Sequence, residues 1–489
     1  MKTLRLNEET LRDGQQSLWA NRMPTAPMLP IAPVMDAAGF GSINIMSGSA
    51  FEACILYLRE DPWERLRLLS QRIFRTDLQI LIRGRSAFGW RRFPNDAIEL
   101  LIRCLQKVGI KGLAVFDGLN DLGNLHWHIQ VAREIGLQIH PALVFALSPV
   151  HTDAYYAAKA AECRELGVDS VTLADASGLL TPARVRTLIP AIRKAMGDDL
   201  DLSFVSHCGT GMGTACYTEA MKLGVDILST ASAPLSQGNS IPSTEETLRL
   251  ARQMGLETQM DDALVKRIDD HFCWVAYEEK KPTGQRVPFN PVQYEKYAAH
   301  QIPGGMMSHL ASQLNNLGLA HRLPEVLEEA GRVREEIGFP VMVTPFSQIV
   351  GVQAVFNVIQ GDRYRTVPSD LCLYARGYYG SPAAPIHPDI MDRILTGEDH
   401  TPIDPAEHYL EPVVSQARAE RGGVVSDEEL LLTLFFSRPT LEKFQKNRRA
   451  IPVSAPQKPL AALIRELGKR PGLRRVRLQK GALKVEHTF

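Results

Sequence analysis

Eight short β-type runs, separated by amphipathic helical stretches, occupy residues 4–232 and restrict the fold more than any other feature of the chain. Strands that alternate with helices form parallel βαβ units, because a parallel strand needs a crossover of a dozen or more residues. The number of runs and their repeat of roughly 30 residues predict a closed (β/α)8 barrel, with an open doubly wound sheet as the alternative. The runs are 4–7, 41–46, 78–84, 112–118, 139–147, 170–176, 202–207 and 226–232.

After about residue 250 the pattern changes from alternating strands and helices to helices alone. Apolar residues recur there at three- and four-residue spacing, which is typical of amphipathic helices. Beyond residue 400 the chain is rich in proline and charge, with one helical segment at 426–437 and a hairpin-like end at 475–489. We therefore expect a barrel domain over 1–290, a helical domain over 291–400 and a C-terminal extension over 401–489.

Charge and cysteine content argue against a nucleic-acid-binding protein and a disulfide-bonded secreted protein. Lys+Arg and Asp+Glu both number 55, and the basic segment at 468–484 contains no aromatic residue, so we expect no nucleic-acid partner. The seven cysteines are dispersed without CxxC spacing, which is typical of reduced thiols in a cytosol. No apolar signal core or run of about 18 apolar residues occurs, so we expect a cytoplasmic chain without membrane contact.

Polar side chains follow most of the predicted strands at their C-terminal ends, where the chemistry of such barrels lies. An arginine there suits a carboxylate ligand, and an aspartate beside a histidine suits a divalent cation. Alternatives stay open: Arg12 and Asp13 as a purely structural ion pair, His207 as a hydrogen-bonded core residue, and Asp117 as the partner of Arg83. The polar set is Arg12, Asp13, Gln16, Ser47, Arg83, Asp117, Asn120, Asp175, His207, Ser232, Ser236 and Asn239.

Six motifs resemble a known family. TLRDGQQS, EDPWERLR, LIRGRSAFGWR, VFDGLNDLGN, ALSPVHTDAYY and ADASGLLTP are similar to the carboxyltransferase barrel of biotin-dependent enzymes. That family includes pyruvate carboxylase, in its single-chain and two-subunit forms, the oxaloacetate decarboxylase α subunit and the transcarboxylase large catalytic subunit. The segment from PGGMMSHLASQ to QAVFNVI resembles the helical domain that follows the barrel in these proteins, so the resemblance covers about residues 8–395.

The resemblance implies a metal site that this chain keeps only in part. The family holds a divalent metal through the Asp of TLRD, a carbamylated Lys of a KDxAG motif and two His of an HxH motif. The corresponding positions here are Asp13, Ala174, Val205 and His207, so the metal candidates are Asp13 and His207 alone. Two protein ligands are too few for tight binding. We expect the metal to be absent or weakly held, unless Asp175 or Cys208 substitutes.

The resemblance also implies residues that surround a keto acid. Asn239 stands where the family has a threonine that carries a proton between biotin and substrate, a transfer that a neutral amide cannot perform. Trp90 stands where the family has a tyrosine. The candidate catalytic residues are Arg83, Gln16, Asp117 and Asn239, and the candidate substrate-binding residues are Arg83, Gln16, Arg12 and Trp90.

The function expected from this resemblance is that of a carboxyltransferase or decarboxylase subunit acting on a small keto acid of the pyruvate or oxaloacetate type. No Met-Lys-Met biotin-attachment stretch lies beyond residue 400, so we expect carboxybiotin on a separate carrier protein. The expected partners are a biotin carboxyl carrier protein or a biotin carboxylase subunit, in a homodimer or larger assembly. Two alternatives stay open: a biotin-independent lyase or carbon–carbon bond enzyme with a carboxylate substrate, and a catalytically silent paralogue in a carboxylase complex.

Overall fold

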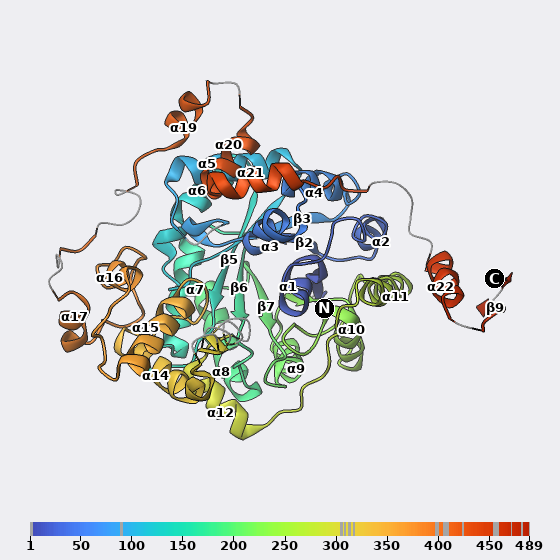
Figure 1. Cartoon of the computed structure of the whole chain (residues 1–489). Coiled ribbons are helices and arrows are strands. Elements are labelled where there is room, and N and C mark those ends of the chain that lie inside the picture. Colours follow the sequence, from blue (N-terminus) through green and yellow to red (C-terminus); the bar gives the residue numbers. More distant parts are fainter. Residues whose placement is uncertain are drawn as a thin grey trace.

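The computed structural model describes most of the chain (Figure 1). The described residues are 3–88, 91–303, 307, 310–311, 314–315, 318–396, 401–403, 410–422, 425–452, 459–470, 472–480 and 483–488.

Eight parallel strands close into a barrel in the order β1 to β8, which confirms the predicted fold. Each strand pairs in parallel with the next, and β1 pairs with β8 through four residue pairs, from Arg5–Ile227 to Glu8–Thr230. The strands are β1 Arg5–Glu8, β2 Ser42–Ser47, β3 Asp77–Ile82, β4 Gly112–Phe116, β5 Gln138–Val144, β6 Ser170–Asp175, β7 Asp201–Ser206 and β8 Ile227–Thr230.

Helices surround the barrel and connect its strands (Figure 1). Several begin at side-chain caps, as at Thr152, Thr181 and Ser243, each of which accepts a backbone N–H of the first turn. The main helices are α2 Ala32–Ala37, α4 Pro62–Ser70, α5 Asn95–Lys107, α6 His126–Glu134, α7 Asp153–Glu165, α8 Pro182–Met196, α9 Gly213–Lys222, α10 Thr244–Gln253 and α11 Asp262–Glu278.

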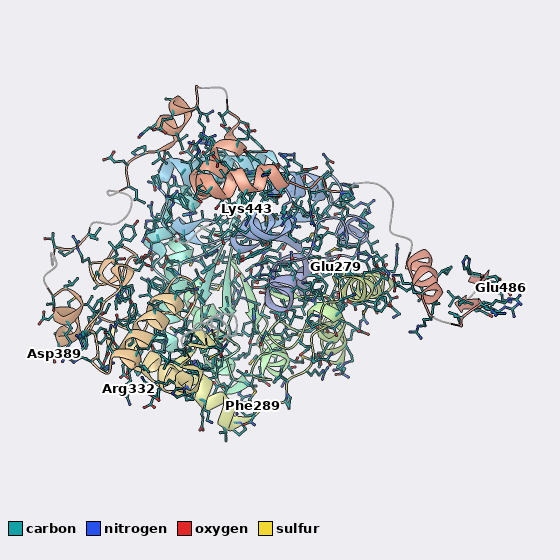
Figure 2. The ribbon with its side chains drawn as sticks, in the orientation of Figure 1. Glu279, Phe289, Arg332, Asp389, Lys443 and Glu486 are labelled. Carbon is teal, nitrogen blue, oxygen red and sulfur yellow. The ribbon has the colours of Figure 1, made fainter. Side chains whose placement is uncertain are left out.

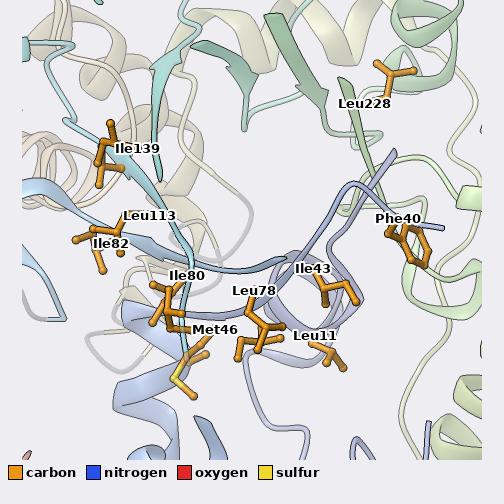
Figure 3. Packing of buried hydrophobic residues seen from close by; sticks show 14 of the residues in the cluster. Leu11, Phe40, Ile43, Met46, Leu78, Ile80, Ile82, Leu113, Ile139 and Leu228 are labelled. Carbon is orange, nitrogen blue, oxygen red and sulfur yellow. The ribbon is translucent and has the colours of Figure 1, made fainter. Parts of the chain in front are cut away.

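The strands alternate apolar and polar residues, because successive side chains point to opposite faces. In β3, Leu78 and Ile80 join the buried apolar cluster between strands and helices, together with Ile43 of β2 and Ile139 of β5 (Figure 3). Most of the alternate residues are polar or small and line an internal cavity, Gln79 of β3 among them. The hydrophobic core of the barrel therefore lies outside the strands, between sheet and helices.

The internal cavity extends through the whole barrel. Its lining reaches from the C-terminal ends of the strands to Arg5, Asp77 and Asp201, which begin β1, β3 and β7. Small and polar side chains line the middle of the barrel, among them Ser170 and Thr172. TIM barrels ordinarily fill this interior with layers of branched apolar side chains. The C-terminal end of this cavity is the natural place for a ligand.

A mostly helical region follows the barrel, as predicted. Its own apolar cluster includes Ile302, Val326, Val350 and Leu371, and α14 and α15 make its most extensive contact. Val343 and Thr344, just before α15, and Ser347 and Gln348, in its first turn, reach the barrel cavity. The helices are α12 Pro291–His300, α14 Leu323–Glu336, α15 Phe346–Gln360, α16 Ser369–Ala375 and α17 Pro388–Ile394.

Within the C-terminal segment, α20 packs against α5 of the barrel, whereas α22 and β9 lie apart from the barrel (Figure 1). Arg67 of α4 contacts Glu428 of α20 at 2.6 Å, and Lys107 of α5 contacts Asp427 at 3.0 Å. The expected terminal hairpin is confirmed, since β9 and β10 pair antiparallel. These elements are α19 Val414–Glu420, α20 Asp427–Phe435, α21 Arg438–Asn447, α22 Pro459–Gly468, β9 Arg475–Lys480 and β10 Leu483–Thr488.

Charged side chains such as Arg332, Asp389 and Glu486 lie exposed at the outside of the molecule (Figure 2). Among the described helices, none is both long enough and apolar enough to cross a membrane.

Candidate active site

The barrel cavity has a volume of about 1000 Å³ and collects many of the polar side chains that the sequence places at strand ends. At the C-terminal ends of the strands it is covered in part by residues around the start of α15. The sequence-predicted residues that line it are Arg12, Asp13, Gln16, Ser47, Arg83, His207 and Asn239, together with Ala174 and Val205 at the altered metal positions.

The turn after β1 supplies three of these side chains. Residues Thr10–Gly14 form a π-helical turn that continues directly into α1, Gln15–Trp19. Gly14 packs closely on the loop after β8, since a Cβ there would lie 3.0 Å from the carbonyl oxygen of Leu235. π-Helical turns are rare in proteins, and those that occur are often found at functional sites. Here the turn brings the side chains of Arg12, Asp13 and Gln16 to the cavity.

Asp13 is the centre of a charged cluster. Its Oδ1 accepts a hydrogen bond from Arg12 Nη1 at 3.0 Å and lies 3.3 Å from His207 Nε2, while Ser17 donates to Oδ2 at 3.3 Å. Arg12 in turn donates from Nε to Glu9 at 2.7 Å. Burial opposes ionisation of Asp13, but the positive charges of His207 and Arg12 outweigh burial and lower the pKa of this carboxyl.

His207 is held in place by the loop that carries Asn239. Its Nδ1 lies 2.8 Å from the backbone carbonyl oxygen of Asn239, and because a carbonyl only accepts, Nδ1 carries a proton in this contact. Burial alone would lower the pKa of His207, but attraction to Asp13 outweighs burial and raises it. The structure brings Asp13, His207 and Asn239 together at the cavity, so His207 is a hydrogen-bonded histidine that also lines the site.

Arg83 lies in the cavity with an incomplete set of partners. Its nearest anion is Glu52, whose carboxylate is 3.7 Å from Nη2, while Nη1 is buried and has no hydrogen-bond partner among the described residues. Burial lowers the pKa of Arg83, and Glu52 partly opposes that effect. A buried guanidinium with free N–H groups fits a carboxylate ligand.

A tight turn fixes the Arg83 backbone. Ala87 N donates to the carbonyl oxygen of Arg83 at 3.0 Å, and Ala87 has a positive φ of 44°, which a non-glycine residue rarely adopts. The neighbouring Gly48 is packed so closely that a Cβ would lie 2.7 Å from the Ala87 carbonyl oxygen. Strained backbone of this kind is maintained where the surrounding structure holds it.

Gln16 lies beside the polar residues at the end of β2. Its Oε1 accepts hydrogen bonds from Ser47 and Ser49, both at 2.9 Å. Because the oxygen is engaged by the two serines, the amide N–H₂ group of Gln16 remains to donate to a ligand in the cavity.

The side chains at the altered metal positions are apolar. Ala174 and Val205 both line the cavity and pack with the buried Ala231 and Ile241. Within the described part of the chain, no group of three or more His, Cys, Asp or Glu side chains is arranged to hold a metal ion. Asp13 and His207 alone provide two donors, which do not fit the four-ligand site that the resemblance implies.

Asp117 was expected to act in catalysis, but the structure does not bring it to the cavity. It is absent from the described cavity lining, and its Oδ2 accepts from the backbone N–H groups of Leu119 at 2.8 Å and Asp121 at 3.2 Å. Asn124 donates to Oδ1 at 3.0 Å. Nor is Asp117 the partner of Arg83, which faces Glu52. The carboxylate of Asp117 instead holds the loop after β4.

Asp175 has the same role after β6. Its two carboxylate oxygens accept from the backbone N–H groups of Leu179 at 2.8 Å and Leu180 at 2.9 Å, and Ser206 donates to Oδ2 at 2.7 Å. It is buried and already satisfied, so it does not replace the missing metal ligand.

Several cavity residues were not found from the sequence. Glu52 is a lone acid in the otherwise apolar run AFEACILYL, which is the signal that could have identified it. Ser347 and Gln348 come from a separate part of the chain and follow no strand, so inspection of strand ends could not find them. Trp90, a predicted substrate-binding residue, lies outside the described residues.

Family models match two parts of the chain. One described as HMGL-like matches residues 122–271, within the barrel. Another, described as the conserved carboxylase domain, matches residues 298–483.

Curated proteins match over most of the chain. A pyruvate carboxylase subunit of Methanocaldococcus jannaschii is 38% identical over 433 residues, which are 88% of this chain and 75% of the relative. The 2-oxoglutarate carboxylase large subunit of Hydrogenobacter thermophilus is 33% identical, over 89% of this chain and 67% of the relative. The methylmalonyl-CoA carboxyltransferase 5S subunit of Propionibacterium freudenreichii is 33% identical, over 79% of this chain and 75% of the relative.

Solved structures agree with these matches. The carboxyl transferase domain of Rhizobium etli pyruvate carboxylase with pyruvate superimposes with a TM-score of 0.82 at 26% identity, over 91% of this chain and 77% of that domain. The same domain with oxamate and biotin gives the same TM-score of 0.82. Against a longer chain of that pyruvate carboxylase, this chain spans 41% of the length. The chain belongs to the family of carboxyltransferase subunits of biotin-dependent enzymes.

Proposed function

We propose that this enzyme transfers a carboxyl group between biotin, carried by a separate protein, and a small 2-oxo acid. The observation that carries this proposal is Arg83, whose buried guanidinium has an unpartnered Nη1, among the described residues, in the same cavity as Gln16. Relatives named for carboxylation of pyruvate or 2-oxoglutarate and a neighbour that contains pyruvate support a 2-oxo acid as the substrate.

Arg83 binds the substrate carboxylate in this proposal, since a guanidinium fork donates two parallel hydrogen bonds to a carboxylate. Gln16 donates its free amide N–H to the same acid, with its oxygen held by Ser47 and Ser49. Arg12 and His207 place positive charge near the 2-oxo group, where negative charge develops as C3 loses its proton. Both cations are oriented in advance by Asp13, so little reorganisation is needed during the reaction.

Biotin would supply the carboxyl group as its N-carboxy derivative and take up the proton released from C3 of the acid. A cavity of about 1000 Å³ exceeds what a small 2-oxo acid fills and leaves room for a second ring. Because Asn239 cannot transfer a proton through its amide, its contribution is the backbone carbonyl that orients His207. Relatives that are named as subunits of pyruvate carboxylase and 2-oxoglutarate carboxylase support a carrier protein or biotin carboxylase subunit as the partner.

Two other functions remain as alternatives with less support. A biotin-independent carbon–carbon bond enzyme is favoured by the apolar Ala174 and Val205, which depart from the metal site of the family. A catalytically silent paralogue would have no need for a buried, partly unpartnered Arg83, which is costly to keep. A homodimer or larger assembly stays a prediction from the resemblance.

Transfer of label tests the proposal. A biotinylated carrier is first loaded with ¹⁴C-bicarbonate by a biotin carboxylase, and the purified chain is then added with a 2-oxo acid. We expect label to move from the carrier to the acid, and Arg83→Met to lower kcat/KM at least about 100-fold, because one charged hydrogen-bonding group is lost. The matched control is Arg103→Met, which removes an exposed helical ion pair and leaves the rate unchanged.

Two outcomes would contradict the proposal. Label that stays on the carrier with every 2-oxo acid tried would exclude carboxyl transfer to this class of acceptor. Equal rates for the Arg83→Met variant and the wild type would remove Arg83 from the substrate site.

A further inference from the structure

The C-terminal mouth of the cavity has two unlike halves. Polar and charged side chains follow β1 to β3, including Asp13, Ser47 and Arg83. Within the strands of the opposite half, the cavity-lining residues nearest the ends of β4 to β7 are the apolar Phe116, Val144, Ala174 and Val205, while the polar Ser177 and His207 follow β6 and β7 in the loops.

The apolar residues form one continuous wall. In the strand register Val144 pairs with Ala174 and Ala174 pairs with Val205, so the three lie side by side across β5, β6 and β7. Val205 and Ala174 are backed by buried apolar residues. Val343, from the region that follows the barrel, packs against the buried cluster that contains Val144, as Phe116 also does, and so continues the wall beyond the strand ends.

The apolar wall faces Arg83 across the barrel. In a closed barrel of eight strands, β3 and β7 are four positions apart and therefore lie opposite one another. If the carboxylate of a substrate binds at Arg83, after β3, the rest of the substrate extends toward Ala174 and Val205. In the family these two positions provide polar metal ligands, whereas here they present only methyl groups.

In the described part of the cavity mouth, no further cationic side chain is available to pair with a second carboxylate of a substrate. Arg12 already contacts Glu9 and Asp13, and His207 faces Asp13. A substrate with a second negative charge would lose solvation without gaining a free partner.

We infer that the acceptor is a 2-oxo acid with an aliphatic side chain longer than a methyl group, whose hydrocarbon part packs against the wall of Val144, Ala174 and Val205. This inference rests on the proposed function, which gives the 2-oxo acid head, and adds the chemistry of the tail. Burial of each extra CH₂ in such a wall strengthens binding by about fourfold.

Calorimetry with a homologous series tests the inference. The probes are pyruvate, 2-oxobutyrate, 2-oxopentanoate, 3-methyl-2-oxobutyrate and 2-oxoglutarate, each titrated into the full chain. We expect Kd to fall by about fourfold for each CH₂ from pyruvate to 2-oxopentanoate. We expect 2-oxoglutarate to bind at least about tenfold more weakly than 2-oxopentanoate, because its second carboxylate meets the apolar wall.

A matched pair of variants separates the wall from general effects. Val205→Thr keeps the shape of the side chain and adds a hydroxyl, so the gain in affinity per CH₂ should fall below about twofold. Val292→Thr makes the same change at a residue that is 59% exposed, away from the cavity, and should keep the wild-type series.

The outcomes distinguish the inference from the function on which it rests. A series in which pyruvate binds and longer acids bind no better, or 2-oxoglutarate binds best, would overturn the inference and leave the proposed function standing. Failure of every 2-oxo acid to bind would overturn both. Because the wild-type series alone decides between these results, a Val205→Thr variant that does not fold leaves the test intact.

Discussion

Arg83 and Asp117 show how two polar residues at neighbouring strand ends acquire different roles. Both follow apolar strands and both are partly buried. Arg83 Nη1 has no hydrogen-bond partner among the described residues, whereas both carboxylate oxygens of Asp117 accept backbone or side-chain N–H groups. A buried polar group without a partner is costly, so its persistence indicates a ligand. A buried polar group that is satisfied by its own loop indicates a structural role.

Asp117→Asn should therefore weaken the fold and leave the cavity intact. An asparagine has one acceptor oxygen, so it cannot satisfy both the Asn124 amide and the backbone N–H of Leu119. We expect the free energy of unfolding to fall by about 1–3 kcal/mol, measured by chemical denaturation, with ligand affinity unchanged. Asp389→Asn, at an exposed position (Figure 2), is the control. A variant of normal stability that loses catalysis would restore Asp117 to the active site.

Residues of the site could be predicted from the sequence only where their position directly after a strand places them at the cavity. Asp13, Arg83 and His207 follow strands, and closure of the barrel brings the ends of all strands to one cavity. Glu52 was missed because it lies in α3, Gly48–Ala53, after the strand end. Partners could not be predicted either, since the pairing of Arg83 with Glu52 depends on the path of the turn after β3.

At the scale of elements, the strands could be predicted because each is short, apolar on alternate positions and followed by a helix. The terminal hairpin could be predicted from its own short β-type runs, and its two strands pair from Arg475–Thr488 to Lys480–Leu483. The sequence did not indicate that α20 would pack against α5, more than 300 residues earlier in the chain. That contact depends on side chains which have no local pattern in common.

The end of α20 supports the turn that carries Arg83. The ring of Phe435 lies 5.7 Å from that of Phe88 and 4.8 Å from that of Phe93. Phe88 in turn stacks on Phe51 at 4.3 Å. These rings join the C-terminal segment to the residues that follow the Arg83 turn.

Phe435→Ala should consequently reduce stability and loosen the Arg83 turn. We expect a loss of about 2 kcal/mol, roughly half the cost for a fully buried phenylalanine, with a weaker affinity for 2-oxo acids in calorimetry. Phe74→Ala removes a phenylalanine that is 75% exposed and should change neither property. If Phe435→Ala keeps full affinity despite its lower stability, the turn does not depend on α20.

At the scale of the whole molecule, the cavity needs two separate parts of the chain. The barrel provides the strand ends, and Thr344, Ser347 and Gln348 at the start of α15 cover them. The two parts meet at Gly118, where a Cβ would lie 2.6 Å from Cε2 of Phe346. The absence of a side chain at Gly118 therefore sets how closely α15 approaches the barrel.

Gly118→Ala should displace α15 and open the cavity. Overpacking of this kind costs about 1–3 kcal/mol, and we expect a lower melting temperature together with weaker 2-oxo acid binding. Adding Phe346→Leu removes the ring that the new methyl group meets, so the double variant should recover both properties in part. Additive losses in the double variant would show that the contact is not the cause.

The mostly polar interior of the barrel has a consequence for the substitutions that this enzyme tolerates. Because the apolar core lies between strands and helices, the inward-facing positions contribute little to the hydrophobic stabilisation that most domains draw from their centre. Substitutions there can alter what the enzyme accepts while the free energy of unfolding stays nearly constant. Evolution can therefore change the substrate of this enzyme through substitutions inside the barrel, without the loss of stability that core substitutions usually cause.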